Sequence, residues 1–242
     1  MKTTGLLLLI FLIIAGCGEK KKIFDFEPAL KIKKTAKAPM INGVLDDECW
    51  KNAEAKPLKL CINGKKPMFQ TSVRAVWDDK NLYVAFECQD MDAMGTVKER
   101  DGLVTSEEYV SVMIDTGRDN KCYAVINVGP AGGVSDEFML VYKDGEKIKE
   151  LKDWNCDNMS ASVSVYGDGA KPGNRDRFWT VELAIPFAEF ITADNIPPKA
   201  KDRWRINFCR LDLTNKTEYS ALMPTGIEGF NKPSKFAWVE FN

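Results

Sequence analysis

The chain of 242 residues contains no histidine. This absence excludes Ser-His and Cys-His nucleophilic catalysis, zinc sites with histidine ligands, and haem held by histidine. Carboxylate chemistry, calcium binding and purely binding or structural roles remain open. The chain also lacks an excess of either charge, since 34 Lys and Arg residues face 35 Asp and Glu residues. A nucleic-acid-binding surface needs a basic excess, so we expect no nucleic-acid partner.

An apolar run near the N-terminus precedes the first cysteine. Residues 6–14 are all apolar, but a helix that spans a bilayer needs about 20 such residues. Lys2 supplies the short basic start of an export signal. The run ends in I-A-G-C at Cys17, which resembles the bacterial lipobox. We therefore predict a signal peptide over residues 1–16 and acylation of Cys17; an ordinary secretory signal with a chance cysteine is the alternative.

Residues 17–38 are predicted to be a lipidated, lysine-rich tether. Acyl chains contribute about 0.8 kcal/mol per buried CH₂ and would hold the protein on a membrane without a spanning helix. Gly18 follows the cysteine where an Asp would favour inner-membrane retention, so we expect the cell envelope, with the outer membrane or cell surface favoured. Apolar residues such as Leu30 and Ile32 would let part of the tether pack on the domain.

Six cysteines remain after Cys17. An exported protein can oxidise them, and six cysteines allow 15 pairings, so the sequence leaves the pairing open. Cys88 falls on the inward face of a predicted strand, where a buried thiol and a bridge are both plausible. The six are Cys49, Cys61, Cys88, Cys122, Cys156 and Cys209.

Residues 39–242 show short runs with a period of two, separated by turn sequences. Residues 73–77 and 82–88 alternate around the turn Asp78-Asp79-Lys80-Asn81 and predict a β-hairpin. Short helices are predicted at 46–53, with Asp46 as N-cap, and at 186–191. The pattern predicts an all-β domain, an antiparallel β-sandwich of the immunoglobulin or jelly-roll kind with one or two short helices. Further strands are predicted at 109–115, 122–128, 137–142, 160–166, 178–185, 204–213, 218–222 and 236–241.

Seven segments of this domain form a combined pattern. They are I-N-G-V-L-D-D-E-C-W at 41–50, V-W-D-D-K-N-L-Y-V at 76–84, V-M-I-D at 112–115, Asn127 with Gly132, Gly133 and Asp136, W-T-V-E-L-A-I-P-F at 179–187, W-R-I-N-F-C-R at 204–210, and P-S-K-F at 233–236. In this order they resemble the family 9 carbohydrate-binding modules of the DOMON-like superfamily. The resemblance implies a non-catalytic domain that holds a polysaccharide or oligosaccharide.

The resemblance also implies where the saccharide binds. The family clamps a sugar ring between aromatic faces, and one aromatic residue precedes P-S-K-F, where this chain has Phe230. The second, usually Trp, corresponds to Val104 and Thr105 and is missing. We therefore predict a site of Phe230, Lys232, Asn127, Arg100 and Glu108, with Phe230 as a mere loop anchor being the alternative.

Calcium sites that order loops are common in the family. Asp90, Asp92 and Asp101 flank one predicted loop and offer oxygen ligands suited to Ca²⁺. Their spacing does not match an EF-hand loop, and acidic loops are often simply solvated. Ca²⁺ is thus a possible cofactor at these three residues and no other cofactor is indicated.

Charged and aromatic residues on the predicted strands have structural interpretations. Charges on central strands must be paired or face solvent, so Glu182 and Arg210 could pair across the sandwich. Tryptophans at strand positions bury large areas and are expected in the core. These tryptophans are Trp77, Trp179, Trp204 and Trp238.

The sequence offers little support for a catalytic or an electron-transfer function. A glycosidase needs two converging carboxylates, but the neighbours Glu107 and Glu108 point to opposite faces of a strand; Asp46-Asp47 is another adjacent pair. Electron transfer through haem lacks the axial histidine. An envelope assembly lipoprotein that uses the fold for protein contacts, or an accessory protein of a glycoside hydrolase system, remains the alternative.

Overall fold

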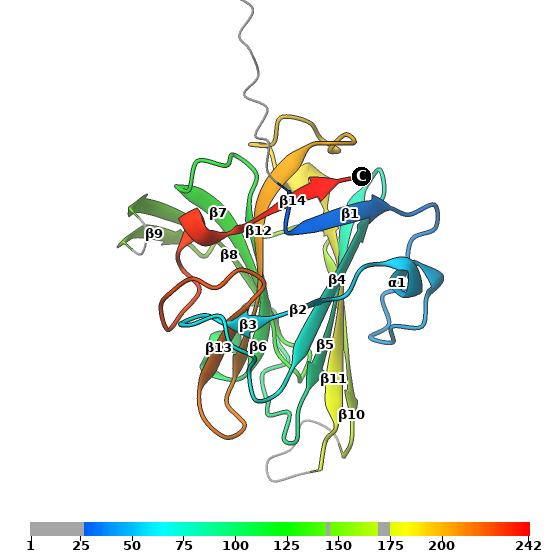
Figure 1. Ribbon diagram of the computed structural model, residues 1–242, viewed down its shortest axis with the longest axis vertical. Coiled ribbons are helices and arrows are strands. Elements are labelled where there is room, and N and C mark those ends of the chain that lie inside the picture. The colour runs from blue at the N-terminus through cyan, green and yellow to red at the C-terminus, as the bar shows by residue number, and fades with distance from the viewer. Residues whose placement is uncertain (1–26, 144–145, 169–174) are drawn as a thin grey trace, which may run out of the picture.

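The computed structural model describes residues 27–143, 146–168 and 175–242. The predicted signal peptide and Cys17 lie outside the described residues. Fourteen strands of the described chain form two packed layers, which confirms the predicted β-sandwich (Figure 1). No helix within the described ranges is long and apolar enough to cross a membrane.

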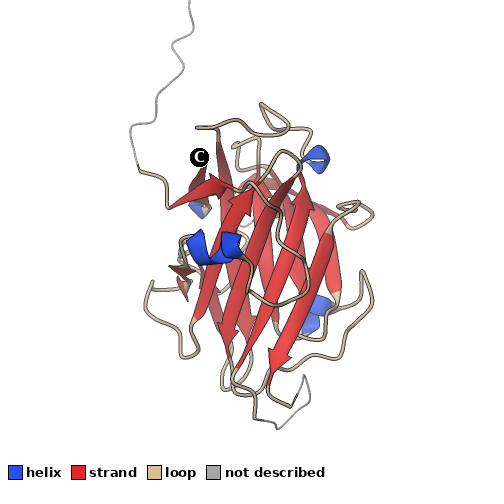
Figure 2. Ribbon diagram, turned by 90° about the vertical axis from the view of Figure 1, so that its right-hand side faces the viewer, coloured by secondary structure: helices blue, strands red, loops and turns tan. Residues whose placement is uncertain are grey.

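One layer, the β4–β5 sheet, forms the right side of the sandwich in Figure 1 and is seen face-on in Figure 2. Its strands are β10 (Ser160–Tyr166), β11 (Phe178–Pro186), β5 (Asn81–Gln89), β4 (Thr71–Trp77) and the short β2 (Lys56–Pro57). The predicted hairpin is confirmed, because β4 and β5 pair antiparallel from Thr71 opposite Cys88 to Trp77 opposite Leu82.

The second layer, the β6–β12 sheet, carries the remaining antiparallel strands. Part of its outer face is covered by the loop over residues 222–236, which packs Phe230 and Phe236 against it. The strands are β14 (Ala237–Phe241), β12 (Arg203–Asp212), β6 (Tyr109–Asp115), β7 (Cys122–Val128), β8 (Val134–Lys143), β9 (Glu146–Leu151), β13 (Glu218–Ala221) and β3 (Lys59–Leu60).

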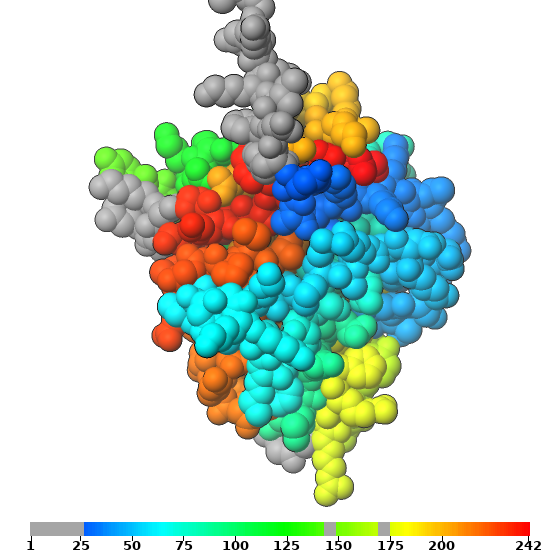
Figure 3. Space-filling view, viewed as in Figure 1, coloured from blue at the N-terminus to red at the C-terminus, as the bar shows by residue number. Residues whose placement is uncertain are grey.

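Strand β1 (Leu30–Lys34) links the two sheets at one edge. It runs parallel to β14 and to β4, whereas the other strand pairs are antiparallel, so the sandwich is mixed rather than wholly antiparallel. Figure 3 shows β1 beside β14 near the top of the view. Leu30 and Ile32 are buried, which confirms that part of the predicted tether packs on the domain. The folded part therefore begins before Pro39, the predicted start of the domain.

The helical elements are short. Helix α1 (Glu48–Asn52) follows Asp47, which is the N-cap in place of the predicted Asp46 and makes no side-chain capping bond. The predicted helix after Pro186 is only a 3₁₀ turn, η2 (Phe187–Glu189). Two further 3₁₀ turns are η1 (Val104–Ser106) and η3 (Pro233–Lys235).

The main core lies between the sheets. Trp77, Trp179 and Trp204 are at most 3 % exposed, as predicted. Trp238 differs, because it is half-buried under the guanidinium of Arg205, 5.3 Å from its ring centroid. Cys88 lies fully buried in this core, and the six cysteines of the described chain are free thiols.

Candidate functional site

The first family-like segment is anchored to the outer face of the β4–β5 sheet by Glu182. Its carboxylate accepts bonds from the backbone N–H groups of Asn42 (2.9 Å) and Gly43 (2.8 Å) and from the indole N–H of Trp50 (2.6 Å). Gly43 has a φ of 82°, and a Cβ there would lie 2.8 Å from the backbone of Val163. Gly43, Trp50 and Glu182 thus hold the loop and α1 on the sheet. Their role is structural.

The predicted pair between Glu182 and Arg210 is wrong. Glu182 faces outward to the α1 segment, whereas Arg210 is buried at the opposite layer and its Nη2 lies 2.5 Å from Asp90 Oδ2. Asp90 also accepts from the indole of Trp179 (3.2 Å). The two charged residues sit on strands that never pair with each other, so each finds its own partners.

Arg210 belongs to a buried cluster with three carboxylates, Asp90, Glu108 and Asp212, which are at most 4 % exposed. Glu108 Oε1 accepts from the backbone N–H of Leu213 (2.7 Å). Glu108 Oε2 has no hydrogen-bond partner among the described residues. Burial, reinforced by the nearby charge of Asp90, raises the pKa of Glu108 to about 8 although Arg210 opposes the rise. Glu108 is therefore a buried residue of the scaffold and not an exposed ligand for a sugar hydroxyl.

The predicted aromatic platform is buried. Phe230 is 7 % exposed and packs edge-on against Tyr109 (6.2 Å between centroids) and Tyr219 (5.3 Å). It lies in a second apolar cluster between the β6–β12 sheet and the loop that covers it. The structure therefore favours the loop-anchor interpretation. Lys232, half-buried, donates its backbone N–H to the carbonyl of Phe230 (2.7 Å).

The other predicted site residues are buried or bonded to partners of their own. Asn127 is on the outer face of β7, 3 % exposed, and its amide contacts the hydroxyl of Ser135 (3.3 Å). Arg100 instead bonds both carboxylate oxygens of Asp136, at 2.9 and 2.7 Å. The five predicted residues thus divide among the outer face, the buried cluster and the sandwich edge, and do not form one site.

The predicted calcium site is not assembled. Asp90 is occupied by Arg210 and Trp179 and also accepts the backbone N–H of Asp92 (2.9 Å). Asp101 instead lies 3.8 Å from Arg100. Within the described part of the chain, no group of three or more His, Cys, Asp or Glu residues could hold a metal ion.

Two tyrosines that the sequence reasoning did not select lie on the outer face of the β6–β12 sheet. Tyr109 and Tyr219 are both half-buried and flank Leu211, with which each is in register. Two residues along β6, Ser111 is in register with Asn127 on the same face, and its hydroxyl has no partner among the described residues. In the sequence, the period-two alternation of β6 and β13 is the one signal that places Tyr109 and Tyr219 on the outer face.

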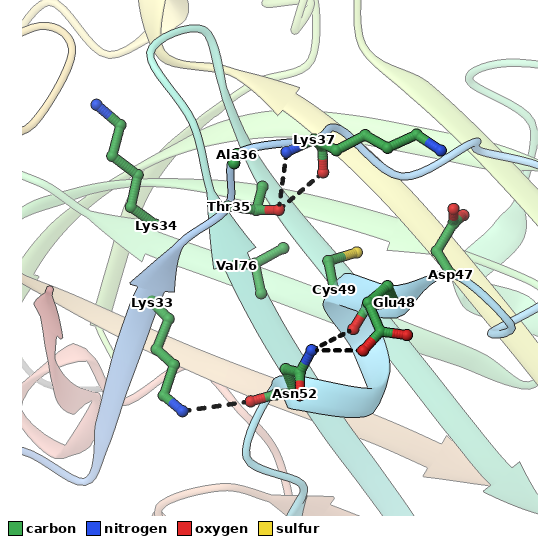
Figure 4. Close-up of a pocket in the computed structure, with 10 residues that line it drawn as sticks. All are labelled: Lys33, Lys34, Thr35, Ala36, Lys37, Asp47, Glu48, Cys49, Asn52 and Val76. Atoms are coloured by element: carbon green, nitrogen blue, oxygen red, sulfur yellow. Dashed lines mark hydrogen bonds between the residues drawn. The ribbon is translucent and has the colours of Figure 1, made fainter.

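A separate hollow of about 340 Å³ lies between the end of β1 and α1 (Figure 4). Lys33 donates to the carbonyl of Asn52 (3.4 Å), and the Asn52 amide donates to Glu48 (2.9 Å). Burial raises the pKa of the Cys49 thiol to about 11, so the thiol is unreactive. The lining mixes both signs of charge and includes no aromatic side chain, so this hollow has no platform for a sugar ring.

Comparison with known proteins agrees with this architecture. Residues 41–124 match the family model described as carbohydrate family 9 binding domain-like, which confirms the predicted resemblance. The described chain has the fold of a carbohydrate-binding module, a non-catalytic type of domain. No curated protein matches the sequence.

Three solved structures share the fold at low sequence identity. One, from Bacteroides uniformis, is described as a candidate carbohydrate-binding protein; it is 15 % identical, with a TM-score of 0.72 over 88 % of this chain and 98 % of that one. A family 9 module from Caldicellulosiruptor kristjanssonii in complex with glucose is 14 % identical, with a TM-score of 0.60 over 88 % and 95 %. The same module in complex with cellotriose is 14 % identical, with a TM-score of 0.59 over 88 % and 93 %.

Proposed function

We propose that this protein is a non-catalytic saccharide-binding lipoprotein of the bacterial cell envelope. The observation that carries the proposal is the shared fold, over 88 % of the chain, with a module in complex with glucose. The export signal and the cysteine at position 17 support lipid anchoring, because acylation would hold the domain at a membrane surface.

The outer face of the β6–β12 sheet is the proposed binding surface. Aromatic side chains present a flat apolar face to the C–H groups of a sugar ring, and Tyr adds a hydroxyl. Tyr109 and Tyr219 provide two partly exposed rings there, held edge-on by the buried Phe230. Ser111 and Asn127 lie on the same face but are at most 3 % exposed, so the two tyrosines carry the proposed surface.

Affinity electrophoresis and calorimetry with glucose, cellotriose and soluble glucans test this surface. We expect retardation of the mature protein, and a loss of about fivefold or more in affinity for Tyr109→Ala and Tyr219→Ala, because a stacked ring contributes about 1 kcal/mol or more. Tyr142→Ala, at a side chain that is 68 % exposed elsewhere, is the matched control. Binding that survives both substitutions would place the saccharide on another surface.

The substitution Phe230→Leu distinguishes the two interpretations of Phe230, a buried anchor for the loop or a platform for the sugar ring. A loop anchor predicts lower stability, by about 1–2 kcal/mol, with unchanged saccharide affinity. A platform predicts the reverse, with affinity lost and stability retained.

Lipid anchoring is tested by the mass of the mature N-terminus and by membrane fractionation. We expect cleavage before Cys17, three acyl chains on the protein, and release into the soluble fraction for Cys17→Ser. An unmodified cysteine in the mature protein would refute the anchor without touching the saccharide proposal.

A further inference from the structure

The sandwich has an apolar cavity at its open edge, away from the outer face proposed for the saccharide. The cavity has a volume of about 400 Å³ and lies between the β8–β9 edge of one sheet and the segment that follows β11. We name it the edge pocket. Its principal walls are Phe138, Leu151, Trp154, Glu189, Phe190 and Ile191.

The walls of the edge pocket are those of a small-molecule site. Trp154 and Phe138 are both half-buried, with ring centroids 5.8 Å apart and planes tilted by 57°. Ile191 is 85 % exposed at the pocket, although an apolar side chain gains by burial. Ligand sites are typically cavities of about 300–1,000 Å³ with mostly apolar walls and a few polar groups. The edge pocket meets this description.

The polar group of the edge pocket is negative. Glu189 is half-buried and accepts a hydrogen bond from the backbone N–H of Asp157. Burial raises the pKa of Glu189, and the negative charges of Asp157 and Asp136 raise it further. The guanidinium of Arg100 donates to both oxygens of Asp136. No ion pair between described residues involves Glu189 or Asp157, so the pocket favours a cation.

We propose that the edge pocket binds a small protonated amine that carries one apolar ring. The ring would lie against Trp154 and the ammonium group would approach Glu189. A cation gains from the face of an indole and more so where water is excluded, and a nearby carboxylate adds a charge-assisted hydrogen bond. An anion of the same shape would meet the carboxylate of Glu189. The proposal does not depend on saccharide binding, because it uses another part of the molecule.

Two isosteric probes of opposite charge test the proposal. We expect 2-phenylethylamine to bind the mature protein with a dissociation constant of about 1 mM or below, as suits a ligand of its size, and 3-phenylpropionate to bind at least about tenfold more weakly. Ligand-detected NMR saturation transfer gives both affinities, and a shift in tryptophan emission reports contact with Trp154.

Variants test whether the probes bind in the edge pocket and whether Glu189 determines the preference for a cation. Glu189→Gln should weaken the amine about tenfold and remove most of the preference over the propionate, while Ile191→Ala should weaken both probes equally. Glu228→Gln, at an exposed carboxylate in the loop after β13, is the matched control and should change neither. Circular dichroism verifies folding of each variant. Failure of the amine to bind, equal affinity for both probes, or indifference to Glu189→Gln would each overturn the proposal.

Discussion

The substitution Glu108→Gln is expected to stabilise the protein at alkaline pH relative to the wild type. Glu108 is fully buried beside Asp90, and its pKa is raised from 4.5 to about 8. Between these two values the unfolded chain is ionised at this position while the folded chain stays protonated. Folding then binds a proton, so the free energy of unfolding falls as pH rises.

The size of the effect follows from the two pKa values. The loss approaches about 1.4 kcal/mol per pH unit midway between the two pKa values, which gives about 3–4 kcal/mol between pH 5 and pH 8 and a limit near 5 kcal/mol above pH 8. Below pH 4.5 both states are protonated and the contribution vanishes. Glutamine carries no charge, so Glu108→Gln removes this pH dependence and leaves only its own small change in hydrogen bonding.

Urea denaturation of wild type and Glu108→Gln, from pH 5 to pH 9, measures the difference directly. The wild type should lose stability relative to the variant across this range. Glu107→Gln is the control without a pH slope: hydrogen bonds from Thr96 and Val97 lower the pKa of Glu107, so this carboxylate is ionised in both the folded and the unfolded chain above about pH 5. Parallel curves for wild type and Glu108→Gln would show that Glu108 is ionised throughout and would refute the reasoning.

Three further predictions concern the scaffold, and chemical denaturation checks each. Gly43→Ala should cost about 2–4 kcal/mol, since it adds a left-handed backbone penalty to a clash, whereas Gly226→Ala, with a φ of 80° and open space at its Cβ, should cost only about 1 kcal/mol; equal losses would contradict the clash. Glu182→Gln should cost about 2–4 kcal/mol, because an amide nitrogen would then face N–H donors; a neutral result would contradict the hydrogen bonds described. Arg210→Met should cost about 3–5 kcal/mol by leaving Asp90 unpaired, and adding Asp90→Asn should recover part of it; no recovery would mean that the two residues act separately.

Local patterns predicted the strands well because the period of two is a local signal. Strands β6, β7 and β10 have the predicted bounds, and each has an apolar face toward the core. Strand β1 was assigned to the tether, since its lysines resemble the charged segment before it and its two apolar residues give only one repeat. Its pairing with β14 joins residues some 200 positions apart, which no local pattern reveals.

The site was predicted less well for the same physical reason. Whether Phe230 faces solvent depends on how the loop over residues 222–236 folds onto β6 and β13, and Tyr109 and Tyr219 close over its edges. The partner of Arg210 depends on the end of β5, about 120 residues away. Contacts of this range follow from sheet order and register, and the sequence pattern determines neither.

The residues of the family-like segments have structural roles in this chain. Gly43 and Glu182 hold a loop on one sheet, and Arg210 neutralises part of a buried acidic cluster. None of them offers a surface to a ligand. A fold can host several ligand specificities because its binding groups lie on residues that the fold itself does not require. The proposed preference for a saccharide is therefore expected to reside in half-buried positions such as Tyr109 and Tyr219, and substitutions there should alter ligand binding while leaving the sandwich intact.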